Sequence, residues 1–180
     1  MKQAKLHYIV VSAKPEDIES VIEMQAQSWL DTYPDDKAGI SRSWVEERVQ
    51  GWLMSDNIKK RQERLRVINN DQHSLYKIAV ADNGSILGVL FVQRQDGKQH
   101  LGMLYVDKKY HGRGVAQGLM QTFLAWEDAR LSTDLEVAVH NKRAIAFYKK
   151  YDFHEVVGSE HLFAEVIPVI TMIRKGERDA

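Results

Sequence analysis

The sequence contains no cysteine, and only 3 of its 180 residues are proline. Without cysteine, the chain has no disulfide, no thiolate ligand for a metal and no cysteine nucleophile. Charge of one sign is not in excess either, because 25 Lys and Arg residues balance 25 Asp and Glu residues. This neutral balance gives no electrostatic reason to expect nucleic acid or an anionic membrane as a partner.

Long hydrophobic runs are also missing. The longest run, Ile86–Val92, is far shorter than the ~20 residues of a membrane-spanning helix. The apolar stretch Leu6–Val11 is too short for a signal peptide and is typical of a first strand. We therefore expect a cytoplasmic protein with no membrane partner. A composition of 44% hydrophobic and 28% charged residues is ordinary for a globular chain, and the length fits a single domain over residues 1–180.

The first part of the chain predicts helices after the opening strand. Pro15 is suited to the first position of one helix, which the apolar spacing extends to about Tyr33. Ser41 is a suitable N-cap for a second helical stretch that carries Trp44 to Leu53. The charged segment Lys59–Arg66 continues as a basic helix, for which we favour a solvated face.

From His73 the hydrophobic period changes from helical to alternating. The turn signals Asp82–Gly84 and Asp96–Lys98 divide residues 73–106 into an antiparallel meander of three strands. Residues 115–126 then predict a helix, and Leu135–Val139 predicts a strand.

The remaining residues predict one more helix and two strands. Asn141 caps the helix, and the strands cover 153–157 and 166–174. The fold class is therefore α/β or α+β, with a mixed, mainly antiparallel central sheet flanked by helices.

A glycine-rich link between a strand and a helix carries the main functional signal. Residues 104–106 end the strand, and Gly112 and Gly114 precede the helix. Such a link exposes several backbone N–H groups at a helix N-terminus, which favours an anion such as phosphate. The spacing excludes a Walker loop, because Gln117 stands where that motif needs glycine. The same residue breaks the dinucleotide fingerprint, but Asp134 lies about 20 residues on, so a nucleotide-binding regulatory domain stays open.

The link resembles a motif of the GCN5-related N-acetyltransferase (GNAT) superfamily, written Q/R-x-x-G-x-G/A. Here it reads His111-Gly112-Arg113-Gly114-Val115-Ala116, with His in place of Gln or Arg at the first position. A second family motif begins at Asn141 and includes Tyr148, with Asp152 where Gly is usual. The order of expected elements also follows the family, so the resemblance covers most of the chain.

The resemblance implies transfer of an acetyl group from acetyl-CoA (coenzyme A as carrier) to a primary amine, of a small molecule such as a polyamine or of a peptide. We expect no metal, because the 7 histidines show no zinc spacing. The resemblance also implies a bulge in the fourth strand and a splay between the fourth and fifth strands, here 104–106 and 135–139, which admits the cofactor. The cofactor residues that it assigns are Leu104, Tyr105, Val106, His111, Gly112, Arg113, Gly114, Val115, Ala116, Asn141 and Tyr148.

Catalytic roles follow from the same resemblance. Because no cysteine can hold the acyl group, direct attack in a ternary complex is the simpler route. Tyr148 is the expected acid for the leaving thiolate, and His100 occupies the position of the family's usual base. Trp29 and Tyr33 are expected to wall the acceptor site. A catalytically silent acyl-CoA-binding module stays open as the alternative, as does the choice between monomer and homodimer.

Overall fold

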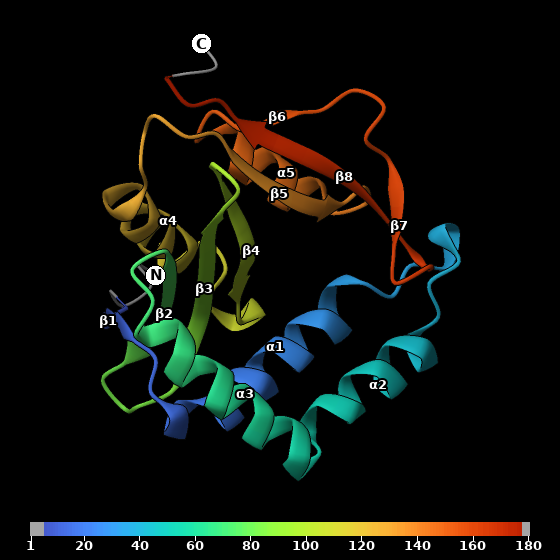
Figure 1. The fold of residues 1–180 in the computed structure, drawn as a ribbon. Coiled ribbons are helices and arrows are strands. Elements are labelled where there is room, and N and C mark those ends of the chain that lie inside the picture. The colour runs from blue at the N-terminus through green and yellow to red at the C-terminus, as the bar shows by residue number, and fades with distance from the viewer. Residues whose placement is uncertain (1–5, 178–180) are drawn as a thin grey trace, which may run out of the picture.

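The computed structural model describes residues 6–177 and contains one sheet with helices on both of its faces (Figure 1). Eight strands form the sheet in the order β1-β2-β3-β4-β5-β8-β6, and β7 also pairs with β8. The strands are β1 (Tyr8–Ser12), β2 (Ser74–Ala81), β3 (Ile86–Gln95), β4 (Lys98–Val106), β5 (Thr133–Ala138), β6 (His154–Glu155), β7 (His161–Phe163) and β8 (Ile167–Arg174). The helices are α1 (Ile18–Thr32), α2 (Arg42–Gln50), α3 (Ser55–Asn69), α4 (Val115–Trp126) and α5 (Lys142–Lys149).

Local sequence signals set the helix ends. Pro15 opens a short 3-10 turn, η1 (Pro15–Asp17), from which α1 continues. The Ser41 hydroxyl accepts a hydrogen bond from the N–H of Trp44, and the Asn141 side chain accepts one from the N–H of Ala144, so both expected N-caps are confirmed. The second helical stretch is interrupted after Gln50 by a 3-10 turn, η3 (Gly51–Leu53), before α3 begins.

The sheet is mixed and mainly antiparallel, as expected. The only parallel pairing between its described strands joins β4 to β5, and it consists of Gln99 with Thr133 and His100 with Asp134. Beyond these two pairs the strands separate, which confirms the predicted splay between the fourth and fifth strands. In the pairing of β3 with β4, Phe91 faces Met103 while Val92 faces Leu101, so Gly102 is the extra residue of a β-bulge.

Three hydrophobic clusters hold the helices on the sheet. On one face, α4 and α5 pack through residues such as Leu119 and Tyr148 against both halves of the sheet. On the other face, α1 and α3 cover β2 and β3. The third cluster packs Trp29 of α1 and Val45 of α2 against Ala138 and Val169 of β5 and β8. The helices therefore bridge the two halves of the sheet on both sides of the splay.

Near the C-terminus the structure differs from the sequence-based prediction. The strand expected over 153–157 is reduced to β6, and β7 was not predicted at all. All three residues of β7 are exposed, so they lack the alternation of buried and exposed residues on which strand prediction depends.

Candidate active site

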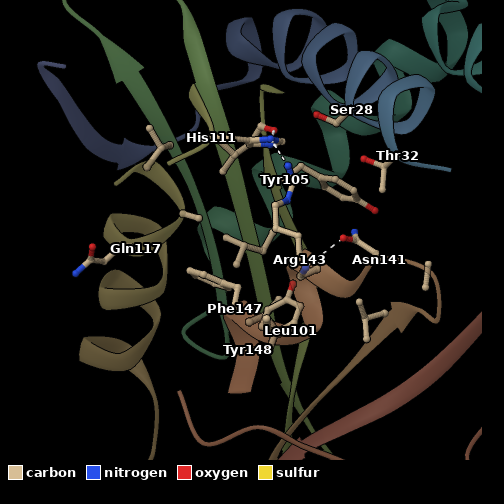
Figure 2. Close-up of a pocket in the computed structure, with 18 of the residues that line it drawn as sticks. Ser28, Thr32, Leu101, Tyr105, His111, Gln117, Asn141, Arg143, Phe147 and Tyr148 are labelled. Atoms are coloured by element: carbon tan, nitrogen blue, oxygen red, sulfur yellow. Dashed lines mark hydrogen bonds between the residues drawn. The ribbon is translucent and has the colours of Figure 1, made fainter. Parts of the chain in front are cut away.

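A cavity of about 650 Å³ opens where β4 and β5 separate (Figure 2). Its walls come from α1, β4, the link between β4 and α4, β5 and α5, so it reaches both faces of the sheet. Most of the residues assigned from the sequence meet here. The ones that line the cavity are Tyr33, Leu104, Tyr105, Val106, His111, Gly112, Gly114, Val115, Ala116, Asn141 and Tyr148.

The glycine link has the backbone geometry of an anion cradle. Gly112 and Gly114 have φ angles of 74° and 87°, which side chains rarely adopt. A Cβ at either position would have no atom within 4 Å, so the space beside the link is open. Because α4 begins at Val115, the N–H groups of its first turn have no partner within the helix and lie at the positive end of the helix dipole. This donor set fits a diphosphate.

His111 and Arg143 meet across the cavity. The His111 Nε2 lies 3.0 Å from the carbonyl oxygen of Val106, and its Nδ1 contacts the Arg143 guanidinium. The carbonyl only accepts and the guanidinium only donates, so Nε2 carries the proton and the ring is neutral. Burial, followed by the charge of Arg143, lowers the pKa of His111, in agreement with this assignment.

Arg143 was not identified from the sequence as a site residue. Its side chain extends from α5 toward the glycine link (Figure 2), which brings a cation to the anion cradle. The available signal was its position inside the second motif, two residues after Asn141. Its partner His111 is 32 residues earlier, so no local pattern connects them.

Three tyrosine side chains line the cavity, Tyr33 and Tyr105 near α1 and Tyr148 on α5 (Figure 2). The Tyr105 hydroxyl accepts a hydrogen bond from Trp29 Nε1 at 3.2 Å. Burial raises the pKa of Tyr33 well above its ordinary value, and a hydrogen bond with Tyr105 adds to this. Burial also raises the pKa of Tyr148. All of these effects favour the protonated phenol, so Tyr148 is available as a proton donor.

The structure does not bring three of the assigned residues to the cavity wall. Trp29 is buried in the core with its ring against Tyr33 and Trp52, so it supports the wall from behind. Arg113 belongs to the glycine link but does not line the cavity. His100 lies at the last pair of β4 with β5, and its Nδ1 is 2.5 Å from the Asp134 carboxylate, which raises the pKa of His100.

Glu136 of β5 also lines the cavity and was not identified from the sequence. Its partner is His161 of β7, with Glu136 Oε1 3.0 Å from His161 Nε2.

Among residues 6–177 no cluster of three or more His, Asp or Glu side chains suited to a metal ion is found. Over the same residues, no helix is both long enough and apolar enough to cross a membrane.

The comparisons with known proteins agree with this arrangement. The acetyltransferase (GNAT) domain family matches residues 36–175. None of the curated proteins matches the sequence.

Among solved structures, the PaiA N-acetyltransferase from Thermoplasma acidophilum in complex with coenzyme A superposes with a TM-score of 0.70 at 18% identity, over 95% of this chain and 99% of that one. A GNAT-family acetyltransferase from Streptococcus pneumoniae gives 0.69 at 18% identity, over 93% and 98%. The ribosomal-protein-S5-alanine acetyltransferase from Vibrio fischeri gives 0.66 at 15% identity, over 97% and 96%. At these identities the superpositions show the fold, whereas the family match spans most of the sequence. The chain therefore belongs to the GNAT family of acetyltransferases, which are acyl-CoA N-acyltransferases.

Proposed function

We propose that the protein transfers an acetyl group from acetyl-CoA to a primary amine by direct attack in a ternary complex. The observation that carries this proposal is the cavity between β4 and β5, which is lined both by the glycine link and by Tyr148. We also propose that residues 1–180 act as one cytoplasmic domain, in keeping with a donor that is an intracellular metabolite. Residues 1–5 and 178–180 lie outside the described part.

The donor site is proposed from the residues around the cradle. The backbone from Gly112 to Ala116 would hold the diphosphate of coenzyme A. The Arg143 guanidinium would exchange its contact with His111 for a charge-assisted hydrogen bond to this diphosphate. Leu104–Val106 line the cavity beyond the last β4–β5 pair, and their backbone groups would bind the amides of the cofactor arm. Bound acetyl-CoA supplies the acyl group as a thioester.

Tyr148 and the strand backbone are proposed to assist the transfer. A backbone N–H of Leu104–Val106 would stabilise the negative charge that develops on the thioester oxygen. Tyr148 lines the cavity and would donate its proton to the departing thiolate, and its raised pKa keeps the phenol protonated before that step. His100 stays a proposal as the base. It does not line the cavity, so it would act through water, and only in its neutral form, at a pH above its raised pKa.

Calorimetry and a thiol-release assay test this function. We expect coenzyme A to bind more tightly than NAD or ATP, and we expect at least one amine or peptide in a panel to accelerate thiol release from acetyl-CoA. Preference for NAD or ATP would support a nucleotide-binding domain instead. Binding of coenzyme A with no accelerated release would support the non-catalytic module.

A further inference from the structure

A second cavity, of about 270 Å³, lies between η3 and the N-terminal part of α3, where the chain turns from α2 into α3 (Figure 1). It shares no lining residue with the cavity between β4 and β5. The ring of Trp52 on its wall packs edge-to-face against Trp29, with ring centroids 4.8 Å apart. We call it the basic cavity, because three of its five lining residues are cationic and none is acidic. The five residues are Trp52, Asn57, Lys60, Arg61 and Arg64.

The cationic residues of the basic cavity come from one helix and lie side by side. Lys60 and Arg64 are one turn apart in α3, and like charges at this spacing destabilise a helix. Within residues 6–177, neither of them nor Arg61 forms an ion pair with a carboxylate. The acidic residues beside them in α3, Asp56 and Glu63, do not line the cavity. The positive charge at this cavity is therefore not balanced by the protein.

Arg61 is held in one position with most of its hydrogen-bond donors unused. One guanidinium N–H donates to the side-chain oxygen of the buried Gln25 at 3.1 Å, and the guanidinium carbon lies 5.1 Å from the centre of the Trp52 ring. A guanidinium has five N–H donors, and over residues 6–177 this is the only hydrogen bond found for Arg61. Burial, and to a smaller degree the charge of Arg64, lowers the pKa of Arg61. The solvated face expected for Lys59–Arg66 therefore does not include Arg61, which is half-buried.

We propose that the basic cavity binds a phosphate dianion, either free phosphate or the phosphoryl group of a phosphomonoester. A phosphoryl group carries a charge of about −1.5 to −2 near pH 7 and has three acceptor oxygens. Arg61 and Arg64 would donate to it through their guanidinium groups, and Lys60 would add an ammonium group. A carboxylate has one charge and two oxygens, so it would leave part of this cationic set unmatched. The site is separate from the cavity between β4 and β5 and does not depend on the proposed function.

Calorimetric titration of the full chain with inorganic phosphate tests the site. The titration is made at constant ionic strength and with saturating coenzyme A, so that phosphate does not bind at the glycine link instead. We expect phosphate to bind the wild type, and we expect acetate to bind at least about tenfold more weakly. Lys60→Gln and Arg64→Gln should each weaken phosphate binding about tenfold. Both side chains are exposed, and within residues 6–177 no hydrogen bond or ion pair involves them, so we expect both variants to fold.

The matched controls remove the same charges from positions of α3 that do not line the basic cavity. Lys59→Gln is the control for Lys60→Gln, and Arg66→Gln is the control for Arg64→Gln. Both controls should leave the phosphate affinity unchanged. Methyl phosphate, titrated in the same way, distinguishes the two sources of the ligand. Binding of methyl phosphate assigns the site to phosphomonoesters, and binding of inorganic phosphate alone assigns it to the free ion.

Four results would overturn the inference. They are equal phosphate affinity in the wild type and in either Lys60→Gln or Arg64→Gln, equal losses in the control variants, acetate binding as tight as phosphate binding, and no binding of either phosphate ligand to the wild type. Because Lys60 and Arg64 do not line the cavity between β4 and β5, a loss in their variants identifies the basic cavity whether or not coenzyme A binds. Failure of the proposed function therefore leaves this test intact.

Discussion

The hydroxyl of Tyr8 donates a hydrogen bond of 3.0 Å to the carbonyl of Gly114, 106 residues later in the chain. The same carbonyl accepts the N–H of Gly118 at 2.9 Å, which starts the hydrogen bonding of α4. A Cβ on Gly118 would lie 2.5 Å from the Tyr8 hydroxyl oxygen, so only glycine leaves room for this contact. The edge strand β1 therefore fixes the residue at which the anion cradle joins α4.

Tyr8→Phe is expected to loosen the cradle without removing any group that would touch the cofactor. Loss of the hydrogen bond should lower the free energy of unfolding by about 1 kcal/mol and weaken coenzyme A binding several-fold. Urea denaturation and calorimetric titration measure the two effects. Tyr76→Phe, a buried tyrosine in the cluster on the other face of the sheet, should leave coenzyme A affinity unchanged. Unchanged affinity in Tyr8→Phe would show that β1 does not set the cradle.

Gly114→Glu is expected to abolish coenzyme A binding, because a carboxylate would stand in the anion site and a non-glycine residue would be strained at a φ of 87°. Gly84→Glu distinguishes the effect of backbone strain from the effect of a carboxylate in the anion site. Gly84 has a φ of 84° and the same open surroundings, but it lies in the turn between β2 and β3. Each variant should lose about 1–2 kcal/mol of stability, and only Gly114→Glu should lose binding in calorimetry. If Gly114→Glu still bound coenzyme A, the assignment of the diphosphate site to the glycine link would be wrong.

Tyr148→Phe tests the proposed proton donor. The ring packs against Phe147 and Phe153, and phenylalanine preserves these contacts. We expect kcat to fall by about 10²-fold or more, within the range of general acid catalysis, while the affinity for coenzyme A changes little. Steady-state kinetics and calorimetry on the same preparation give both values. A kcat equal to that of the wild type would take Tyr148 out of the mechanism.

Arg143→Ala is expected to weaken coenzyme A binding about tenfold, since it removes a charge-assisted contact to the proposed diphosphate. The difference from wild type should shrink as salt is added, because partly exposed charges are screened. Calorimetric titrations with coenzyme A at low and high ionic strength measure this difference in affinity. Arg42→Ala removes an exposed arginine whose partner is Glu46 on the same helix, and it should have no effect on affinity. A loss that does not vary with salt would indicate a packing role for Arg143.

The His100–Asp134 pair should make stability depend on pH. Asp134 raises the pKa of His100 in the folded state, so the protonated histidine stabilises the fold. This contribution is fully present below the unfolded histidine pKa of about 6.5 and is lost as the pH rises through the higher folded pKa. Asp134→Asn should therefore lower stability at acidic pH and have less effect at alkaline pH. Urea denaturation from about pH 5 to about pH 9 checks this, and a uniform loss across that range would contradict it.

Much of the fold could be predicted because its signals are local. Ser41 and Asn141 are caps whose side chains bond the backbone three residues later, and Asp82–Gly84 turns the chain within its own hairpin. The glycine link is likewise one continuous segment, so its φ requirement could be inferred from the positions of Gly112 and Gly114. Such features need no knowledge of what packs against them.

The parts of the site that sequence did not predict depend on contacts across the fold. Arg143 reaches His111 only because α5 and the glycine link face each other over the splay. Trp29 has the helical spacing expected of a pocket wall, but the contacts with α2 and β8 bury it. Glu136 has the sequence pattern of any exposed strand residue, and its place on the cavity follows from where the pairing of β4 and β5 stops.

The two residue pairs that join β4 to β5 also have a mechanical consequence. Strands β1–β4 and strands β5–β8 form two halves of the sheet whose direct backbone pairing is confined to one end. A small rotation of one half relative to the other would therefore break few hydrogen bonds. A donor molecule bound between the two halves of the sheet would restrict this rotation. Amide hydrogens near the separated strand ends should then exchange with solvent more slowly, and the melting temperature should rise with donor concentration.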